Sequence, residues 1–363
     1  MIPGWHNEGF PTDFDTFLEP DGTVNAVMLF VDFPDAPIEA AEPTWQSIDA
    51  YLELHQPGAE WLRTASYGAV SIEITAVGEW YRMSQPSTSY GLDRAATFDQ
   101  HAAYLGEAVA LADADLDFSE YDIVYVVTAP NATGISNSPG YIDASDSRII
   151  ADGVAISHGV TFGTDVWNWA EPYRHLVLAH ETGHIFSLPD LYAFSGETHR
   201  FVGGWDVMAD IDGPAPGPFA WHRWKLGWIA DRQVACLAEP GVYTVRLTSL
   251  DRRNGTKLAV IRTGPHTALV IESRRATGLD SGACSTGVLV YTVDSAVPTG
   301  EGPIRVLDAS PGDAGNGSCS DLDIATLGIG SRPSTLTDPS TGVTVEVTRQ
   351  SRHADVVTVT INP

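Results

Sequence analysis

The amino-acid sequence predicts a mixed α/β (α+β) domain followed by a β-rich domain. Over residues 1–230, short apolar runs alternate with stretches that have helical spacing, which is the pattern of a mixed sheet with covering helices. Over residues 231–363, apolar and polar residues alternate between turns of Gly, Pro, Asn and Asp. We therefore expect the second part to be a β-sandwich or barrel that packs on the first.

The elements of the first part follow from two periodicities. Short apolar runs and strict alternation, the two marks of strands, predict strands at 24–33, 70–83 and 122–129. Strong helix formers at helical spacing predict helices at 44–54, 99–114 and 171–186. The third of these helices carries three of the eleven histidines of the chain.

The second part contains six alternating segments and almost no helical pattern. The segments lie at 241–247, 268–273, 287–294, 304–309, 342–348 and 355–361. Only 321–327 has the spacing of a short helix. Strands separated by turn residues at this spacing are typical of a sheet-on-sheet domain.

The charge balance excludes two classes of partner. Lys and Arg number 20 against 47 Asp and Glu, which gives a formal charge of -27. Such a surface repels phosphate groups and anionic lipid, so we expect no nucleic-acid binding and no charge-driven membrane binding.

We also expect no membrane insertion, because no run reaches the roughly 18 apolar residues that a span needs. The first residues, MIPGWHNEGF, lack the basic and then apolar pattern of a signal peptide.

The three cysteines lie in the last third of the chain, at Cys236, Cys284 and Cys319. Their spacing is not that of a zinc knuckle or a redox pair. Cys284 and Cys319 flank a Gly- and Ser-rich region that would tolerate a cross-link. In an oxidising compartment we expect these two to form a disulfide, and three free or buried thiols are the alternative.

The segment HLVLAHETGHIFSLPDLYAF, residues 175–194, contains the pattern H-E-x-x-H at His180, Glu181 and His184. On a helix, residues four apart lie on one face, so both imidazoles can reach one ion while Glu181 borders its open side. Imidazole is a good zinc ligand, and a catalytic zinc site has three protein ligands and one open position. The remaining helix positions are mainly apolar, and histidines without partners would be costly in such surroundings. The pattern therefore predicts a zinc site.

A third ligand is needed, and two arrangements could provide it. In one, a glutamate on a later helix completes the site. Glu197 lies in a Gly-, Ser- and Thr-rich segment without helical spacing, however, and the next glutamate is Glu239. In the other, the helix ends just after the second histidine and the chain turns back, which is the arrangement that this sequence favours.

Pro189 supports the second arrangement. It cannot continue the helical hydrogen bonding, and it biases Leu188 away from helical geometry, so the helix should end near Ser187. The extended step then brings the carboxylate of Asp190 back toward the ion, and aspartate is a good zinc ligand. We favour Asp190 as the third ligand, with His175 and His199 as the alternatives.

Met208 is one of only four methionines and follows the metal-binding helix in the segment GGWDVMADIDGPAPGPFAWHRWKLGW, residues 203–228. Core filling is the usual role of a methionine. Its position between a Gly-Gly turn and a Gly- and Pro-rich loop also suits an apolar floor beneath the ion.

Together, H-E-T-G-H-I-F-S-L-P-D-L-Y and W-D-V-M-A resemble the M6 family of zinc metalloproteases, the immune inhibitor A-like peptidases of the metzincin clan. That family is similar in having H-E-x-x-H-x-x-G-x-x-D and a W-D-[LIV]-M methionine turn. The resemblance extends to AVMLFVDFPDAP, TASYGAVSIEITAVGEWY, ALVIESRRATGLD and GVLVYTVD, and so covers most of the chain. It implies a metzincin-like catalytic domain with a twisted mixed sheet and an active-site helix. It also implies zinc on His180, His184 and Asp190, Glu181 as general base and Met208 as the turn methionine.

Ser187 departs from the family pattern, which has glycine at this position. That glycine usually allows a left-handed backbone, which would cost serine about 1–2 kcal/mol. We expect the fold and the metal site to survive the change and the turn to be altered.

The functional hypothesis is a secreted, zinc-dependent endopeptidase that acts on protein or peptide substrates. Calcium is a second candidate ion, with no residues assigned to it. The alternatives are a relative that binds metal or protein with weak or no catalysis, and a zinc hydrolase of another substrate class. The sequence does not predict the cleavage preference or the oligomeric state.

Overall fold

The structure is a computed structural model, and it forms two compact units, Asp13–Ser187 and Met1–Thr12 with Leu188–Pro363. The described residues are 6–145, 148–169, 171–313, 315, 317, 319–330 and 332–363. The division falls at Ser187, whereas the sequence pattern changes near residue 231, because residues 188–230 pack with the β-rich part of the chain. Among the described residues, no helix has the length and apolar character that crossing a membrane requires.

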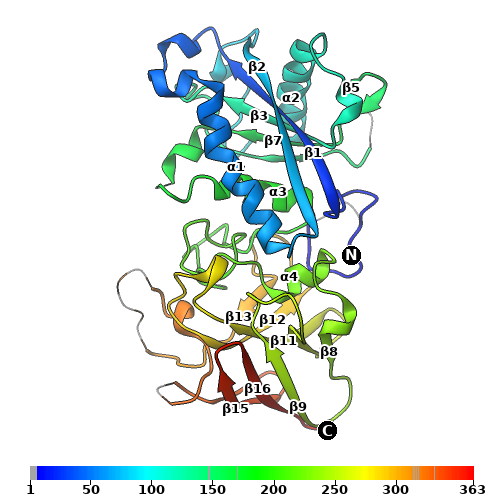
Figure 1. The fold of residues 1–363 in the computed structure, drawn as a ribbon, viewed down its shortest axis with the longest axis vertical. Coiled ribbons are helices and arrows are strands. Elements are labelled where there is room, and N and C mark those ends of the chain that lie inside the picture. The colour runs from blue at the N-terminus through cyan, green and yellow to red at the C-terminus, as the bar shows by residue number, and fades with distance from the viewer. Residues whose placement is uncertain are drawn as a thin grey trace. The chain divides into compact units, whose positions relative to one another are not determined.

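The unit Asp13–Ser187 contains a five-stranded sheet in the order β2-β1-β3-β7-β4. Figure 1 labels β1, β2, β3 and β7 of this sheet. Its strands are β1 (Gly22–Asp32), β2 (Val70–Arg82), β3 (Ile123–Thr128), β4 (Gly140–Ile142) and β7 (His158–Phe162), and β5 (Ile150–Ala151) pairs with β6 (Val154–Ala155) separately. The first four strands in the sheet run parallel, and β4 is antiparallel to β7 at the edge. β3 is buried along its whole length, as expected where helices cover both faces of a parallel sheet.

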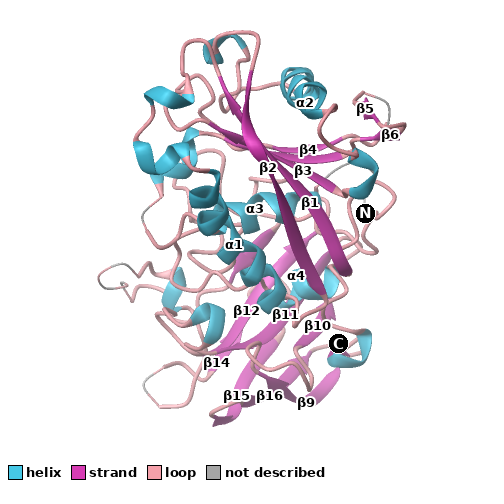
Figure 2. Ribbon diagram, turned by 45° about the horizontal axis from the view of Figure 1, so that its top comes forward, coloured by secondary structure: helices cyan, strands magenta, loops and turns pink. Residues whose placement is uncertain are grey.

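Three helices cover this sheet: α1 (Ile48–Ala65), α2 (Phe98–Ala112) and α3 (Leu176–Ile185) (Figure 2). Successive side chains of a strand point to opposite faces, so neighbouring residues of β7 show which helix lies where. Thr161 contacts His101 of α2, whereas Phe162 contacts the ring of His55 of α1. α1 also packs against α3. α2 therefore covers one face, and α1 and α3 cover the other.

The predicted mixed α/β character of this part is confirmed, and two helix starts are corrected. Pro43–Gln46 forms a separate 3-10 turn, so α1 begins at Ile48 rather than at residue 44 and continues to Ala65. α3 begins only at Leu176, five residues later than expected. The strands β4 and β7 were not predicted, because both are short and neither alternates cleanly between apolar and polar residues.

The second unit contains a five-stranded sheet, a four-stranded sheet and the short helix α4 (Ala220–Lys225). The five-stranded sheet has the order β13 (Ile304–Val306), β12 (Gly287–Asp294), β11 (Thr267–Arg274), β10 (Leu258–Arg262) and β8 (Val234–Cys236). The four-stranded sheet has the order β14 (Thr335–Thr337), β15 (Thr344–Ser351), β16 (Ala354–Ile361) and β9 (Gly241–Thr248). All six predicted strand segments overlap with these strands.

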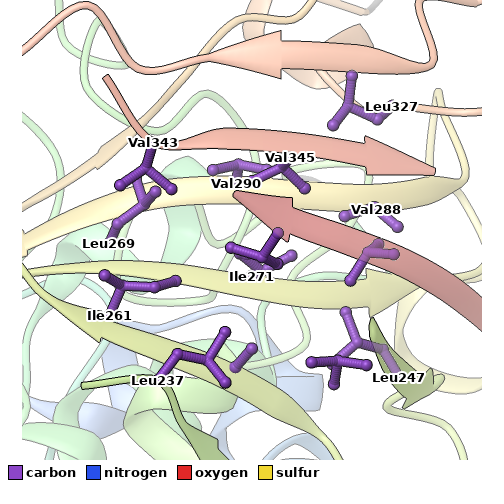
Figure 3. Close-up of a cluster of buried hydrophobic side chains, with 14 of the residues drawn as sticks. Leu237, Leu247, Ile261, Leu269, Ile271, Val288, Val290, Leu327, Val343 and Val345 are labelled. Carbon is purple, nitrogen blue, oxygen red and sulfur yellow. The ribbon is translucent and has the colours of Figure 1, made fainter. Parts of the chain in front are cut away.

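One apolar cluster joins the inner faces of the two sheets (Figure 3). Ile271 and Val290 come from the five-stranded sheet, and Val345 and Val359 come from the four-stranded sheet. Alternate residues of each strand contribute to the cluster, which is the arrangement of a β-sandwich.

The helix predicted at 321–327 was wrong. Only Leu322–Ile324 forms a 3-10 turn. The carboxylate oxygens of Asp323 in this turn accept hydrogen bonds from the backbone amides of Ser320 at 2.6 Å and of Gly204 at 2.7 Å.

The cysteines of the second unit differ in their bonding. Cys284 and Cys319 form the expected disulfide, and Cys236 is free and exposed.

Both lysines of the second unit are buried. Lys225 and Lys257 are 2% and 0% exposed. Burial lowers the pKa of each ammonium group to about 8.

Candidate metal centre

The helix α3 carries His180, Glu181 and His184, as the sequence predicted. His180 and Glu181 are buried, and His184 is half-buried. The two imidazole rings lie with their centroids 4.9 Å apart and their planes at 89°. The four-residue spacing therefore places both rings on one face of the helix, as helical geometry requires.

Contacts with β3, α1 and β4 fix α3 in its unit. The hydroxyl groups of Thr182 and Tyr125 of β3 are hydrogen-bonded at 2.9 Å in the core. On the side of α1, a methyl group added at Gly58 would lie 2.3 Å from the backbone oxygen of His175. On the side of the edge strand β4, a methyl group added at Gly140 would lie 3.5 Å from Cβ of His184. The helix is thus closely packed where it carries the candidate ligands.

The helix ends in a left-handed turn at Ser187. Its backbone amide donates to the carbonyl of His184 at 2.9 Å, and its φ angle is 87°. Ser187 is fully buried. The turn was expected to be altered by the serine, but Ser187 adopts the left-handed conformation that the family glycine allows, at a cost of about 1–2 kcal/mol. The turn, and not only Pro189, ends the helix and redirects the chain.

Asp190 follows three residues after this turn and completes a three-residue group. One ligand atom from each of His180, His184 and Asp190 can be chosen so that all three lie within 4.8 Å of one another. Two ligands on a tetrahedral zinc ion, each bound at about 2.0–2.1 Å, would be separated by roughly 3.4 Å. The group is therefore compact enough to converge on one ion through small side-chain movements. Two imidazoles and a carboxylate are also a donor set that suits zinc.

The two alternative third ligands are not part of this group. In the described part of the chain, the group of His180, His184 and Asp190 is the one that could hold a metal ion. His175 stands at the N-terminal end of α3, where burial lowers its pKa. The Nε2 atom of His199 lies 3.9 Å from the Oδ2 atom of Asp210.

Hydrogen bonds hold the segment around Asp190 in place. Its backbone amide donates to Thr299 Oγ1 at 2.9 Å, and its carbonyl accepts from the amide of Gly300 at 3.1 Å. The amide of Leu191 donates to the carbonyl of Met208 at 2.9 Å. The candidate third ligand and the turn that contains Met208 are thus joined through a hydrogen bond of the neighbouring residue Leu191.

Asp206 organises the turn that contains Met208. Its φ angle is 81°, and its carboxylate accepts from the amides of Met208 at 2.9 Å and Phe219 at 2.8 Å. The same carboxylate lies 2.6 Å from Nδ1 of His222, whose Nε2 lies 2.9 Å from Glu8 Oε1. Met208 itself is fully buried. This turn is therefore built on a buried group of three charged side chains.

The residues that support the candidate site were not predicted from the sequence. Thr299 lies 109 positions from Asp190, and Glu8 lies 214 positions from His222. No local pattern marks contacts between residues so far apart. Asp206 and His222 had only an indirect signal in the sequence, because both lie in the segment 203–228 around Met208.

No protein-family model and no curated protein sequence matches this chain. The resemblance to the M6 family therefore rests on the motif residues themselves. The geometry of α3, the turn at Ser187 and Asp190 is the structural basis for proposing a function.

Proposed function

We propose that the protein is a zinc-dependent endopeptidase of the metzincin type. The observation that carries this proposal is the grouping of His180, His184 and Asp190 within 4.8 Å, with the carboxylate of Glu181 on the same helix. Three protein ligands leave one position open, which is the arrangement of catalytic rather than structural zinc sites.

Zinc bound to this group would act as a Lewis acid, polarising a carbonyl group and favouring ionisation of water at neutral pH. Glu181 follows His180 directly on the helix, so its carboxylate borders the open side of the group. In the proposed reaction Glu181 takes a proton from the attacking water and then delivers it to the leaving amine. The burial of Glu181 restricts competing bulk water around this carboxylate.

The edge strand β4 supports a peptide as the substrate. It is the last strand of its sheet in the described residues, and Gly140 at its start lies against His184. Extended peptides bind exposed sheet edges by adding a strand, with main-chain hydrogen bonds providing affinity. A peptide paired with β4 would pass the face of α3 that carries the candidate ligands.

We also propose an extracellular location. The disulfide between Cys284 and Cys319 supports this, because disulfides persist mainly in oxidising compartments.

The test combines metal content with hydrolysis of casein or gelatin. We expect about one zinc per chain by elemental analysis, and proteolysis that is lost on chelation and restored by zinc. Glu181→Gln should retain zinc but reduce hydrolysis by about 10²–10⁴-fold, the usual contribution of a general acid–base group. Glu53→Gln, an exposed glutamate of α1, is the matched control and should leave hydrolysis unchanged. Activity that resists chelation would refute the proposal, and bound zinc without cleavage would favour the metal-binding relative.

A further inference from the structure

The loop between β12 and β13, residues 295–303, contacts the segment that carries Asp190. Two backbone hydrogen bonds join them: the amide of Gly300 donates to the carbonyl of Asp190, and the amide of Phe194 donates to the carbonyl of Gly300, both at 3.1 Å. A third bond runs from the amide of Asp190 to Thr299 Oγ1 at 2.9 Å. The β-rich part of the chain therefore fixes the backbone of the candidate third ligand.

Gly300 makes this close approach sterically feasible. Its φ angle is 72°, and a methyl group added to it would lie 2.3 Å from the ring of Phe194. A side chain at this position would separate the two segments, so the contact depends on the backbone of the loop.

The hydroxyl of Thr299 has a second contact, with the side chain of Asp190. Because Thr299 Oγ1 already accepts the amide hydrogen of Asp190, its own proton is available to donate. It is directed to Asp190 Oδ2 across a long distance of 3.5 Å. A threonine hydroxyl has a single proton, so donation to Oδ2 favours one rotamer of the carboxylate and one of its oxygens.

From this geometry we propose that Thr299 is a positioning residue for Asp190, through which the β-rich part of the chain sets the affinity of the metal site. The proposal rests on the zinc site proposed above. Hydrogen bonds to the carboxylates that bind a metal orient their oxygens, and loss of such a partner typically weakens metal binding 10–100-fold. Thr299 does not contact the ion in this role.

The experiment measures the affinity of the full chain for Zn²⁺ and Co²⁺ by competition with a chromophoric chelator. Thr299→Val keeps the shape of the side chain and removes both hydrogen bonds to Asp190, so affinity should fall 10–100-fold. Thr299→Ser keeps the hydroxyl and should stay within about threefold of the wild type. Ser295→Ala, in the same loop, removes a hydroxyl that bonds to the carbonyl of His266 and is the matched control.

The visible spectrum of bound Co²⁺ gives a second readout, because it reports ligand geometry directly. Thr299→Val should change this spectrum at saturating cobalt, and Thr299→Ser should not. Unfolding of the metal-free variants in urea separates positioning from a purely structural role. If Thr299→Ser lost as much stability and as much metal affinity as Thr299→Val, the proposal would be overturned.

Wild-type affinity and an unchanged spectrum in Thr299→Val would also overturn it, provided that Asp190→Ala weakens binding. If Asp190→Ala binds metal as tightly as the wild type, the zinc site itself is wrong and the role of Thr299 falls with it. The Asp190 variant therefore distinguishes failure of this inference from failure of the proposed function.

Discussion

Removal of the imidazole of His222 should destabilise the second unit strongly. The side chains of His222 and its two partners, Glu8 and Asp206, are all 0% exposed. Burial alone would lower the pKa of His222, but the charges of Asp206 and Glu8 raise it to about 10. The imidazole is therefore a cation at neutral pH, and it stands between two buried carboxylates.

The magnitude follows from what His222→Ala leaves behind. Removing one partner of a buried ion pair costs about 3–5 kcal/mol, because the remaining charge stays buried without compensation. One kilocalorie per mole shifts the melting temperature of a unit of about 150–250 residues by roughly 2–4 °C. We therefore expect melting to fall by about 6–20 °C. His266→Ala, at an exposed histidine, should change stability by less than about 0.5 kcal/mol.

The dependence of this effect on pH has a defined sign. Because the folded pKa of His222 lies above the ordinary value of 6.5, its stabilisation is fully present below about pH 6.5 and is lost as the pH rises through about 10. Urea unfolding at pH 6, 8 and 10 should show the wild type approaching the His222→Ala variant as the pH rises. A loss below about 1 kcal/mol at pH 6, or a constant difference between the two proteins up to pH 10, would refute this reasoning.

The remaining predictions concern packing, the turn and the boundary between parts. Gly58→Ala should lower the free energy of unfolding by about 1–3 kcal/mol through overpacking against α3. Gly78→Ala, at a glycine with open space around it, is the control and should not lower it. Equal effects of the two substitutions on urea unfolding would contradict the packing argument. Ser187→Gly should stabilise the metal-free protein by up to about 1 kcal/mol, since glycine relieves the left-handed strain, and a loss of stability on calorimetry would count against that strain. A chain that ends at residue 230 should be insoluble, because residues 188–230 lose their packing partners; a soluble, cooperatively folded fragment would disprove this dependence.

Periodicity predicted many of the strands and the helix α3, because local burial sets the pattern of these elements. The strand β12 has the predicted bounds, 287–294, whereas α3 starts five residues after its predicted start and ends one residue before its predicted end. The resemblance of a local motif drew attention to the turn at Ser187, where we expected the serine to alter the backbone. Its φ angle of 87° shows instead the left-handed conformation that the family glycine allows.

Contacts between distant segments could not be predicted in this way. The bond from Asp190 to Thr299 and the ion pair of Glu8 with His222 join segments that share no local pattern. The packing of residues 188–230 against the β-rich part also depends on contacts between segments that are distant in the sequence. Ala220, for example, donates its amide hydrogen to Glu272 at 2.7 Å, a long-range contact that periodicity does not record.

The burial of both lysines has a consequence for chemical labelling. Lys225 and Lys257 are the only lysines in the sequence, and each is at most 2% exposed. Reagents that acylate primary amines need an accessible side chain, so lysine acylation in the native protein requires at least local opening. Arginine, which such reagents leave unmodified, carries the permanent positive charge of the surface. The extent of lysine acylation over time therefore measures how often the second unit opens, without any engineered probe.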